Sequence, residues 1–196
     1  MSFLYDQIFD DVKKLIKKYE SRDPKEILIQ RGVNIIAFKE NTKLLGMYKI
    51  IKRNSFVFYN PFVDKRIQNM VFAHELGHDL YHKDMAKNEN LVEYELFDIN
   101  SEMELCANIF AAHLLLDEKE LIKDIKEGYT YNQLASMYDV NVNLMIFKLN
   151  EMHRMGIKIR KEEANPNFFR DIDGKDIKNY DIYLSLIHIS EPTRPY

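Results

Sequence analysis

The most constraining feature of the sequence is a His-Glu-x-x-His motif made of His74, Glu75 and His78. Positions i and i+4 of an α-helix share one face, with Cβ atoms roughly 6 Å apart, so both imidazoles can bind one metal ion. Glu75 is turned about 100° from His74 around the helix, which places its carboxylate beside the metal without binding it. A general base that activates a water on the metal needs this position. The motif therefore predicts a helix with a metal site on one face.

The opposite face of the same helix has a different character. Phe72, Leu76 and Leu80 recur at i, i+4 spacing and form an apolar stripe. Such a stripe faces the core in a helix of a globular protein. We therefore expect a helix over residues 70–82 that is anchored in the core by one side and presents the metal ligands on the other.

A third metal ligand has to come from elsewhere, because a catalytic zinc takes three protein ligands and leaves its fourth position to water. His82 is the nearest histidine, but it lies eight residues from His74, or about 12 Å along the helix axis. That distance is too long for one ion. We expect His82 to pack or to hydrogen-bond beside the ligands instead.

A second helix, predicted over residues 101–116, supplies acidic candidates for the third ligand. Glu104 shares a face with Asn108 and with small alanines that allow close packing, whereas Glu102 lies about 200° away around the helix. We predict Glu104 as the third ligand and Asn108 as a residue that orients a ligand. An alternative stays open, because Ser101 and Glu104 also have the spacing of a capping box.

Hydrophobic periodicity and turn residues predict the remaining elements. Further helices are expected over residues 4–19, 24–30, 118–125, 130–138 and 142–152, and strands over residues 33–38, 45–51 and 55–59. The polar stretch 83–100 is too long for a simple connector and is expected to be an irregular, functional loop. The predicted class is α+β: a small antiparallel sheet packed against a zincin-type active-site helix and a glutamate helix, with a helix-turn-helix-like pair at the C-terminal end.

Composition narrows the function. Lys and Arg number 28 against 31 Asp and Glu, a net charge of −3, which argues against nucleic acid or anionic lipid as the main partner. Cys106 is the single cysteine, which suits a reducing cytoplasm, and we expect its thiol to be buried and inert rather than reactive. No apolar run reaches the ~20 residues that span a bilayer, and the first residues do not have the pattern of a signal peptide. We therefore expect a cytoplasmic protein without a membrane segment.

Residues 133–149 resemble a helix-turn-helix. A DNA reader places basic or amide side chains on the outer face of its second helix. Here that helix has Asn143 and Lys148 but also Glu151. Contact with DNA and a packing or protein-recognition role both stay open, and the acidic net charge favours the second.

Three segments together resemble the ImmA/IrrE family of zinc metallopeptidases: Arg22-Asp23-Pro24, residues 73–82 and residues 104–115. The resemblance covers roughly residues 19–152. It departs from the family pattern after the second helix, where Leu116-Asp117 replaces the usual Met-Pro. This departure does not touch a candidate ligand.

The resemblance implies a gluzincin-like zinc metallo-endopeptidase, with His74, His78 and Glu104 holding Zn²⁺ and Glu75 activating water. It also implies a protein partner, since family members cleave a helix-turn-helix repressor encoded beside them, often on a mobile genetic element. Another class of function remains open, a non-catalytic regulatory module that binds DNA or a protein and in which zinc is structural. The two differ at the fourth metal position, because a structural zinc normally has four protein ligands.

An extended peptide substrate is expected to pair with an exposed sheet edge, for which residues 55–59 are the candidate strand. Tyr81, His82 and Tyr94 are candidates for stabilising the oxyanion of the reaction.

The chain is expected to divide into four regions. Residues 1–128 form the zinc metallopeptidase core, and residues 129–160 form the helix-turn-helix-like pair packed on it. Residues 161–183 are a polar extension. Residues 184–196 resemble the translation of a sequencing adapter, so we exclude them from the fold and the site.

Overall fold

The fold is that of a computed structural model, which describes residues 2–93 and 101–157. The predicted extension 161–183, the adapter-like residues 184–196 and Tyr94 lie outside the described residues. The described helices are α1 (Ser2–Tyr19), α2 (Pro24–Gln30), α3 (Lys65–Tyr81), α4 (Glu102–Leu115), α5 (Glu118–Lys126), α6 (Tyr131–Met137) and α7 (Val142–Arg154), and the strands are β1 (Asn34–Ala37), β2 (Gly46–Ile51), β3 (Asn54–Tyr59) and β4 (Leu91–Glu93). None of the described helices is long and apolar enough to cross a bilayer.

The four described strands form one sheet in the order β1-β3-β2-β4. A tight turn at Lys52 and Arg53, both with positive φ, joins β2 to β3 as an antiparallel hairpin, the arrangement that a two-residue loop favours. β1 then pairs with the outer side of β3 and runs parallel to it. The expectation of an antiparallel sheet was therefore wrong in part, since the sheet is mixed. The class, α+β, is as predicted.

The fourth strand lies inside the stretch 83–100 that we expected to be irregular. β4 pairs antiparallel with β2, with Glu93 opposite Gly46 and Val92 opposite Met47. A strand of three residues carries too little alternation to be recognised in a polar stretch. This correction matters for function, because β4 forms the edge of the sheet beside α3.

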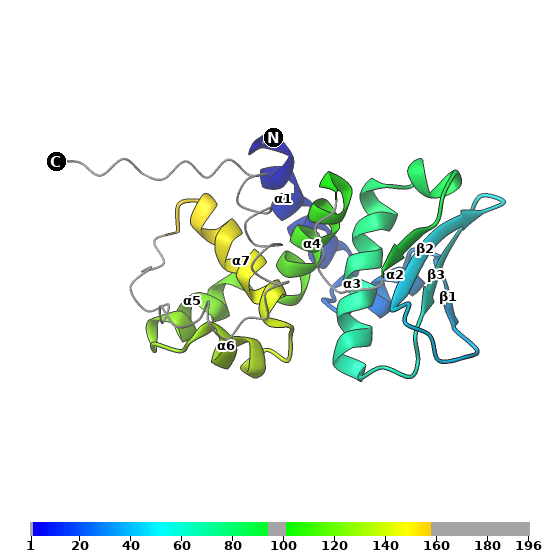
Figure 1. Cartoon of the computed structure of the whole chain (residues 1–196). Helices are drawn as coiled ribbons and strands as arrows, with labels where there is room; N and C mark the ends of the chain where they lie inside the picture. The colour runs from blue at the N-terminus through cyan, green and yellow to red at the C-terminus, as the bar shows by residue number, and fades with distance from the viewer. Residues whose placement is uncertain (1, 94–100, 158–196) are drawn as a thin grey trace.

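The helices follow the sheet in layers (Figure 1). α3 packs against β2 and β3, α4 packs against α3, and α1 and α7 pack against α4. The centre of the molecule is the α3–α4 contact, where Leu76, Leu105, Ile109 and Phe110 are fully buried. α4 is thus covered on several sides, which explains why its middle is almost entirely apolar or small.

Two details set the start of α3 and its close approach to α4. Asp64 caps α3 by accepting a hydrogen bond from the Arg66 N–H at 2.7 Å, so the helix begins at Lys65 and not near residue 70 as predicted. Gly77 then lies against α4: a Cβ at this position would be 3.0 Å from the Cα of Ala107. The absence of that Cβ allows the two helix backbones to approach closely.

The C-terminal pair consists of α6 and α7. Thr130 and Gln133 form a reciprocal capping box at the start of α6, and Asp139 with positive φ turns the chain before α7. α7 packs on α4, and its Lys148 and Glu151 side chains are 1% and 0% exposed. Lys148 therefore does not lie on an outer face, and the basic side chain that had favoured DNA contact belongs to an internal packing contact.

Candidate metal centre

Three side chains from two helices meet at one point. The Nε2 atoms of His74 and His78 on α3 are 2.9 Å apart. Glu104 on α4 places Oε2 3.0 Å from the first nitrogen and 3.6 Å from the second. All three side chains are buried. Of the His, Cys, Asp and Glu residues in the described ranges, these three form the group with metal-binding geometry, their ligand atoms lying within 4.8 Å of one another.

The spacing suits a small divalent cation. Ligand atoms about 2 Å from a tetrahedral zinc lie roughly 3.3 Å apart, close to the distances between these nitrogens and this oxygen. Glu104 Oε2 is also buried without a hydrogen-bond partner among the described residues. A cation that accepts two imidazole lone pairs and one carboxylate oxygen would satisfy all three atoms, so the residues present fit the metal that the sequence predicts.

The second nitrogen of each imidazole is held by a neighbour. His74 Nδ1 lies 2.8 Å from Asn108 Oδ1, and since an amide oxygen only accepts, the imidazole N–H donates to it. Nε2 is therefore the nitrogen that faces His78 and Glu104, and in the neutral imidazole it carries the lone pair. His78 Nδ1 lies 2.9 Å from His82 Nδ1, so His82 hydrogen-bonds to one of the candidate ligands, as expected. Such outer contacts fix the orientation of metal-binding histidines.

Ser101 does not draw Glu104 away from the site. Its hydroxyl oxygen accepts a hydrogen bond from the backbone N–H of Glu104 at 3.2 Å, which caps α4. The Glu104 carboxylate turns to the two imidazoles. Capping and the candidate ligand role therefore coexist, because one uses the backbone and the other the side chain.

The two imidazoles of the site differ in their electrostatics, since burial lowers the pKa of His78 to about 4. Burial by itself would lower the pKa of His74, but the carboxylates of Glu93 and Glu104 outweigh it and raise this pKa to about 10. Burial would likewise raise the pKa of Glu104, yet its contacts with His74 and His78 lower it. The carboxylate therefore stays ionised, as a metal ligand must be.

Glu75 lies next to the three candidate ligands but is not one of the residues with metal-binding geometry. Its side chain is 1% exposed, and both carboxylate oxygens lack a hydrogen-bond partner among the described residues. Burial raises its pKa well above the ordinary value, despite the opposing effect of His74. Gly46 at the start of β2 makes room for the carboxylate: a Cβ there would be 2.5 Å from Glu75 Oε1.

Sequence reasoning missed two acidic residues around the site. Glu93 on β4 places Oε2 3.4 Å from His74 Nε2. Asp79 on α3 is fully buried. It binds Arg31 through Oδ2, and it accepts a hydrogen bond from the Tyr48 hydroxyl at 2.8 Å. For Asp79 a signal existed, since an ionised side chain directly after His78 on a largely buried helix requires a partner. For Glu93 none did, because its strand was not recognisable.

Several expectations about substrate contacts change. The segment 55–59 is not an edge, because β3 pairs with β1 and with β2. The described edges are β1 and β4, and β4 carries Glu93 to His74. Tyr81 packs on Phe110, and burial together with the nearby Asp11 raises the pKa of its hydroxyl, which places that group toward α1.

The cysteine behaves as expected. Cys106 is buried, and burial raises the pKa of its thiol to about 11. A thiol with this pKa is protonated at neutral pH and is a poor nucleophile.

Replacing Asn108 with alanine is expected to weaken zinc binding by about 10- to 100-fold, because the N–H of His74 loses the acceptor that orients its ring. Competition with a chromogenic zinc chelator measures the affinity. Cys106→Ala is the matched control, since it also shortens a buried side chain of α4 but leaves the Asn108 acceptor of His74 in place. Equal affinities of Asn108→Ala and wild type would show that the ring is held in place by packing alone.

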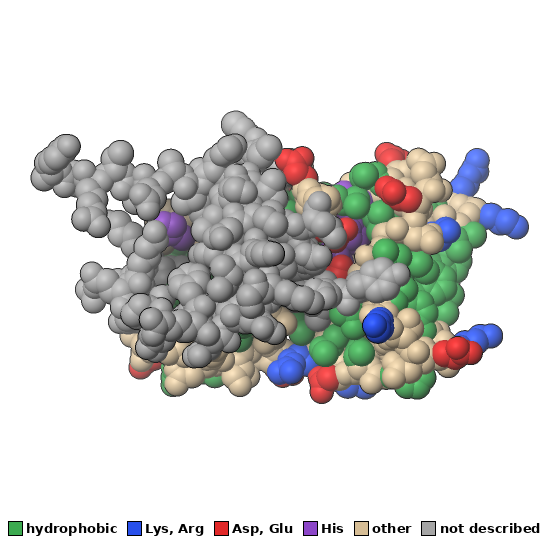
Figure 2. All heavy atoms as spheres, in the orientation of Figure 1, with side chains coloured by type: hydrophobic (Ala, Val, Ile, Leu, Met, Phe, Trp, Pro, Cys, Tyr) green, Lys and Arg blue, Asp and Glu red, His purple; other side chains and the backbone are tan. Residues whose placement is uncertain are grey.

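Figure 2 shows histidine and acidic side chains meeting at the surface between the sheet and the helices, next to an apolar area over the sheet. The candidate ligands and Glu75 are themselves largely buried, with Glu104 the most exposed of them at 9%.

Comparison with known proteins agrees with this architecture. Residues 30–150 match the IrrE N-terminal-like domain of peptidase family M78, a span that includes α3, α4 and all the site residues described above. A protein of Bacillus phage phi105 named "Uncharacterized immunity region protein 2" is 31% identical over 137 residues, which cover 70% of this chain and 85% of the phage protein. The resemblance to the ImmA/IrrE family is thereby confirmed, and this chain belongs to the IrrE N-terminal-like family of peptidases.

Proposed function

We propose that this protein is a zinc-dependent endopeptidase that cuts a helix-turn-helix transcriptional repressor at a specific site. The observation that carries the proposal is the convergence of His74, His78 and Glu104, with Glu75 beside them. A metallopeptidase role also fits the M78 family match and the phage immunity-region relative.

Each residue has a defined task in this proposal. His74, His78 and Glu104 would hold Zn²⁺, which when bound lowers the pKa of water and polarises a peptide carbonyl. Glu75 takes the proton from that water and passes it to the leaving amine. A pKa raised above that of an ordinary carboxylate suits both transfers, because the group takes a proton more readily and holds it until the leaving amine accepts it. Asn108 and His82 keep the two imidazoles oriented.

The substrate backbone would bind along β4. An extended peptide can add to an open sheet edge through backbone hydrogen bonds, and its side chains then point alternately toward and away from α3. β4 is the described edge next to the candidate ligands. We therefore place the scissile peptide bond near Glu93, with its carbonyl toward the paired imidazoles.

A structural metal is the alternative, and one observation favours it. Glu93 Oε2 lies 3.4 Å from His74 Nε2, within the spacing of a shared coordination shell. X-ray absorption of the zinc-loaded chain distinguishes the two. An enzyme has three protein ligands and a water, and its spectrum is unchanged in Glu93→Gln. A structural site has four protein ligands and loses one in that variant.

The function is tested with the purified, zinc-loaded chain and the helix-turn-helix repressor encoded in the neighbouring gene. We expect two repressor fragments by mass spectrometry, produced by one cleavage. 1,10-Phenanthroline should abolish cleavage, and added zinc should restore it, because the metal is part of the site. An intact repressor after incubation with a fully zinc-loaded, folded chain would contradict the proposed substrate.

A further inference from the structure

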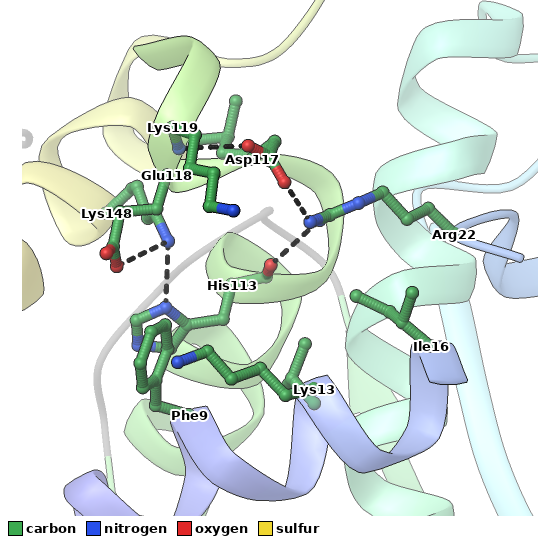
Figure 3. A pocket seen from close by; sticks show the side chains of 11 residues that line it. Phe9, Lys13, Ile16, Arg22, His113, Asp117, Glu118, Lys119 and Lys148 are labelled. Atoms are coloured by element: carbon green, nitrogen blue, oxygen red, sulfur yellow. Dashed lines mark hydrogen bonds and ion pairs between the residues drawn. The ribbon is translucent and has the colours of Figure 1, made fainter. Parts of the chain in front are cut away.

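A hollow of about 120 Å³ lies between α1, α4, α5 and α7, and none of the candidate metal ligands lines it (Figure 3). We call it the Lys148 hollow after its most buried charge. One wall is apolar and consists of Phe9, Val12, Ile16 and Leu116. The volume is several times the ~10–15 Å³ that one water molecule requires. A small ligand therefore fits, and a hollow of this shape offers it both an apolar and a charged surface.

Lys148 is the unusual feature of this hollow. Its side chain is 1% exposed, and its amino group lies 3.0 Å from His113 Nδ1 and 4.0 Å from Glu118 Oε2. Lysine is almost never fully buried unless it is paired. Here the contact with the carboxylate is at the outer limit of an ion pair, and the histidine contributes no negative charge. Burial lowers the pKa of Lys148 to about 8, so the amino group remains largely protonated at neutral pH.

The neighbours of Lys148 also leave polar atoms unsatisfied. His113 uses Nδ1 to accept from Lys148, which places its proton on Nε2, and that atom is buried without a hydrogen-bond partner among the described residues. Glu118 Oε2 is likewise buried without a hydrogen-bond partner among the described residues. Figure 3 shows the Lys148 amino group between these two side chains. Buried polar groups normally have partners, and residues 2–93 and 101–157 leave room here for a ligand to supply them.

The other charges around the hollow set the charge of a ligand. Lys13, Arg22 and Lys119 add three cationic groups to Lys148. Asp117 pairs with Arg22 and also caps α5 by accepting from backbone N–H groups, so these two charges offset each other, and Glu118 is the other acidic residue of the lining. The hollow thus has an excess of positive charge. The carboxylate of Glu118 would still repel a second negative charge, which favours a monoanion over a dianion such as phosphate.

We propose that the Lys148 hollow binds a small organic monocarboxylate, with its carboxylate on the amino group of Lys148 and its apolar part on Phe9, Val12 and Leu116. A charge-assisted hydrogen bond to a buried amino group is stronger than one in water. The ligand would contact α1, α4, α5 and α7 together. The site is independent of the proposed peptidase chemistry and would stand if that proposal failed.

The test measures the binding of isovalerate, the probe, to the full chain by ligand-observed NMR titration. We expect a dissociation constant of about 1 mM, in the range for a ligand of about seven non-hydrogen atoms. Isovaleramide has the same shape without the charge and should bind at least tenfold more weakly. Lys148→Met keeps the side-chain length and should also reduce isovalerate binding at least tenfold. Lys14→Met removes an exposed lysine of α1 and should leave binding unchanged.

Three results would overturn the proposal: no binding of isovalerate at 20 mM to the folded wild type, equal binding of the amide, or equal binding by Lys148→Met. Tighter binding of inorganic phosphate than of isovalerate would overturn the ligand class. If Lys148→Met does not fold, Ile16→Phe provides the second variant. This variant places a phenyl ring, which is larger than the isoleucine side chain, in the hollow without changing the charges of the lining. It should exclude isovalerate as well.

Discussion

Replacing Glu75 with glutamine is expected to reduce repressor cleavage by about 10²- to 10⁴-fold while the protein binds zinc as tightly as the wild type. Glutamine has the shape of glutamate but cannot accept a proton at neutral pH. The three candidate ligands are unchanged, so metal affinity should not fall. The fold should persist as well, because both oxygens of Glu75 are buried without hydrogen-bond partners in the described part of the chain, and an amide costs less to bury than a carboxylate.

Cleavage rates and zinc content, measured on the same preparations, separate these effects. Glu102→Gln is the matched control, since Glu102 is an exposed glutamate of α4 that should not affect the rate. A Glu75→Gln protein with full zinc content and a rate within threefold of wild type would remove Glu75 from the chemistry. Loss of zinc from this variant would instead indicate that Glu75 belongs to the metal shell.

The second large effect is expected for the buried ion pair between Asp79 of α3 and Arg31. Asp79→Asn should lower the free energy of unfolding by about 3 kcal/mol, because it leaves the Arg31 guanidinium partly buried without its anion. Asp79 is fully buried and its contacts with Arg31 measure 2.6 and 2.7 Å, whereas Arg31 retains 17% exposure. Burial would raise the pKa of Asp79, but Arg31 outweighs it and lowers this pKa, so the carboxylate is charged.

Urea denaturation of the metal-free protein measures this effect without a contribution from metal binding. Asp84→Asn is the control, since Asp84 also pairs with a cationic side chain, that of Lys87, but on the surface, and no measurable change is expected. The double variant Asp79→Asn/Arg31→Gln should be more stable than the sum of the single effects predicts. Additive effects would show that Arg31 and Asp79 contribute independently.

The residues of the candidate metal site could largely be predicted from the sequence. The grouping of His74 and His78 follows from helix geometry alone, because residues one turn apart share a face in any α-helix. Glu104 and Asn108 could be predicted because the same periodicity selects one face of α4, and small residues on that face indicate close packing. Whether these side chains bind zinc and perform catalysis remains a prediction.

Other contacts depend on how distant segments pair. The edge strand was misassigned because the β2–β3 hairpin places β3 inside the sheet, and β1 joins it from the other side. Lys148 was considered as a surface residue, yet α7 turns it toward α4. In both cases the local pattern is compatible with two arrangements, and the energy of packing against a third element selects one of them.

The sequence by itself determined the helix that carries His74 and His78, its apolar anchor and the glutamate helix, since each rests on residues within a few turns of one another. The family followed from three motif segments taken together. Only the tertiary structure decided the sheet order, the approach of Glu93 to His74, the Asp79–Arg31–Tyr48 cluster and the Lys148 hollow. The physical reason is distance along the chain. Periodicity reports which face of an element is buried, whereas its partner is chosen by packing between segments that the periodicity does not relate.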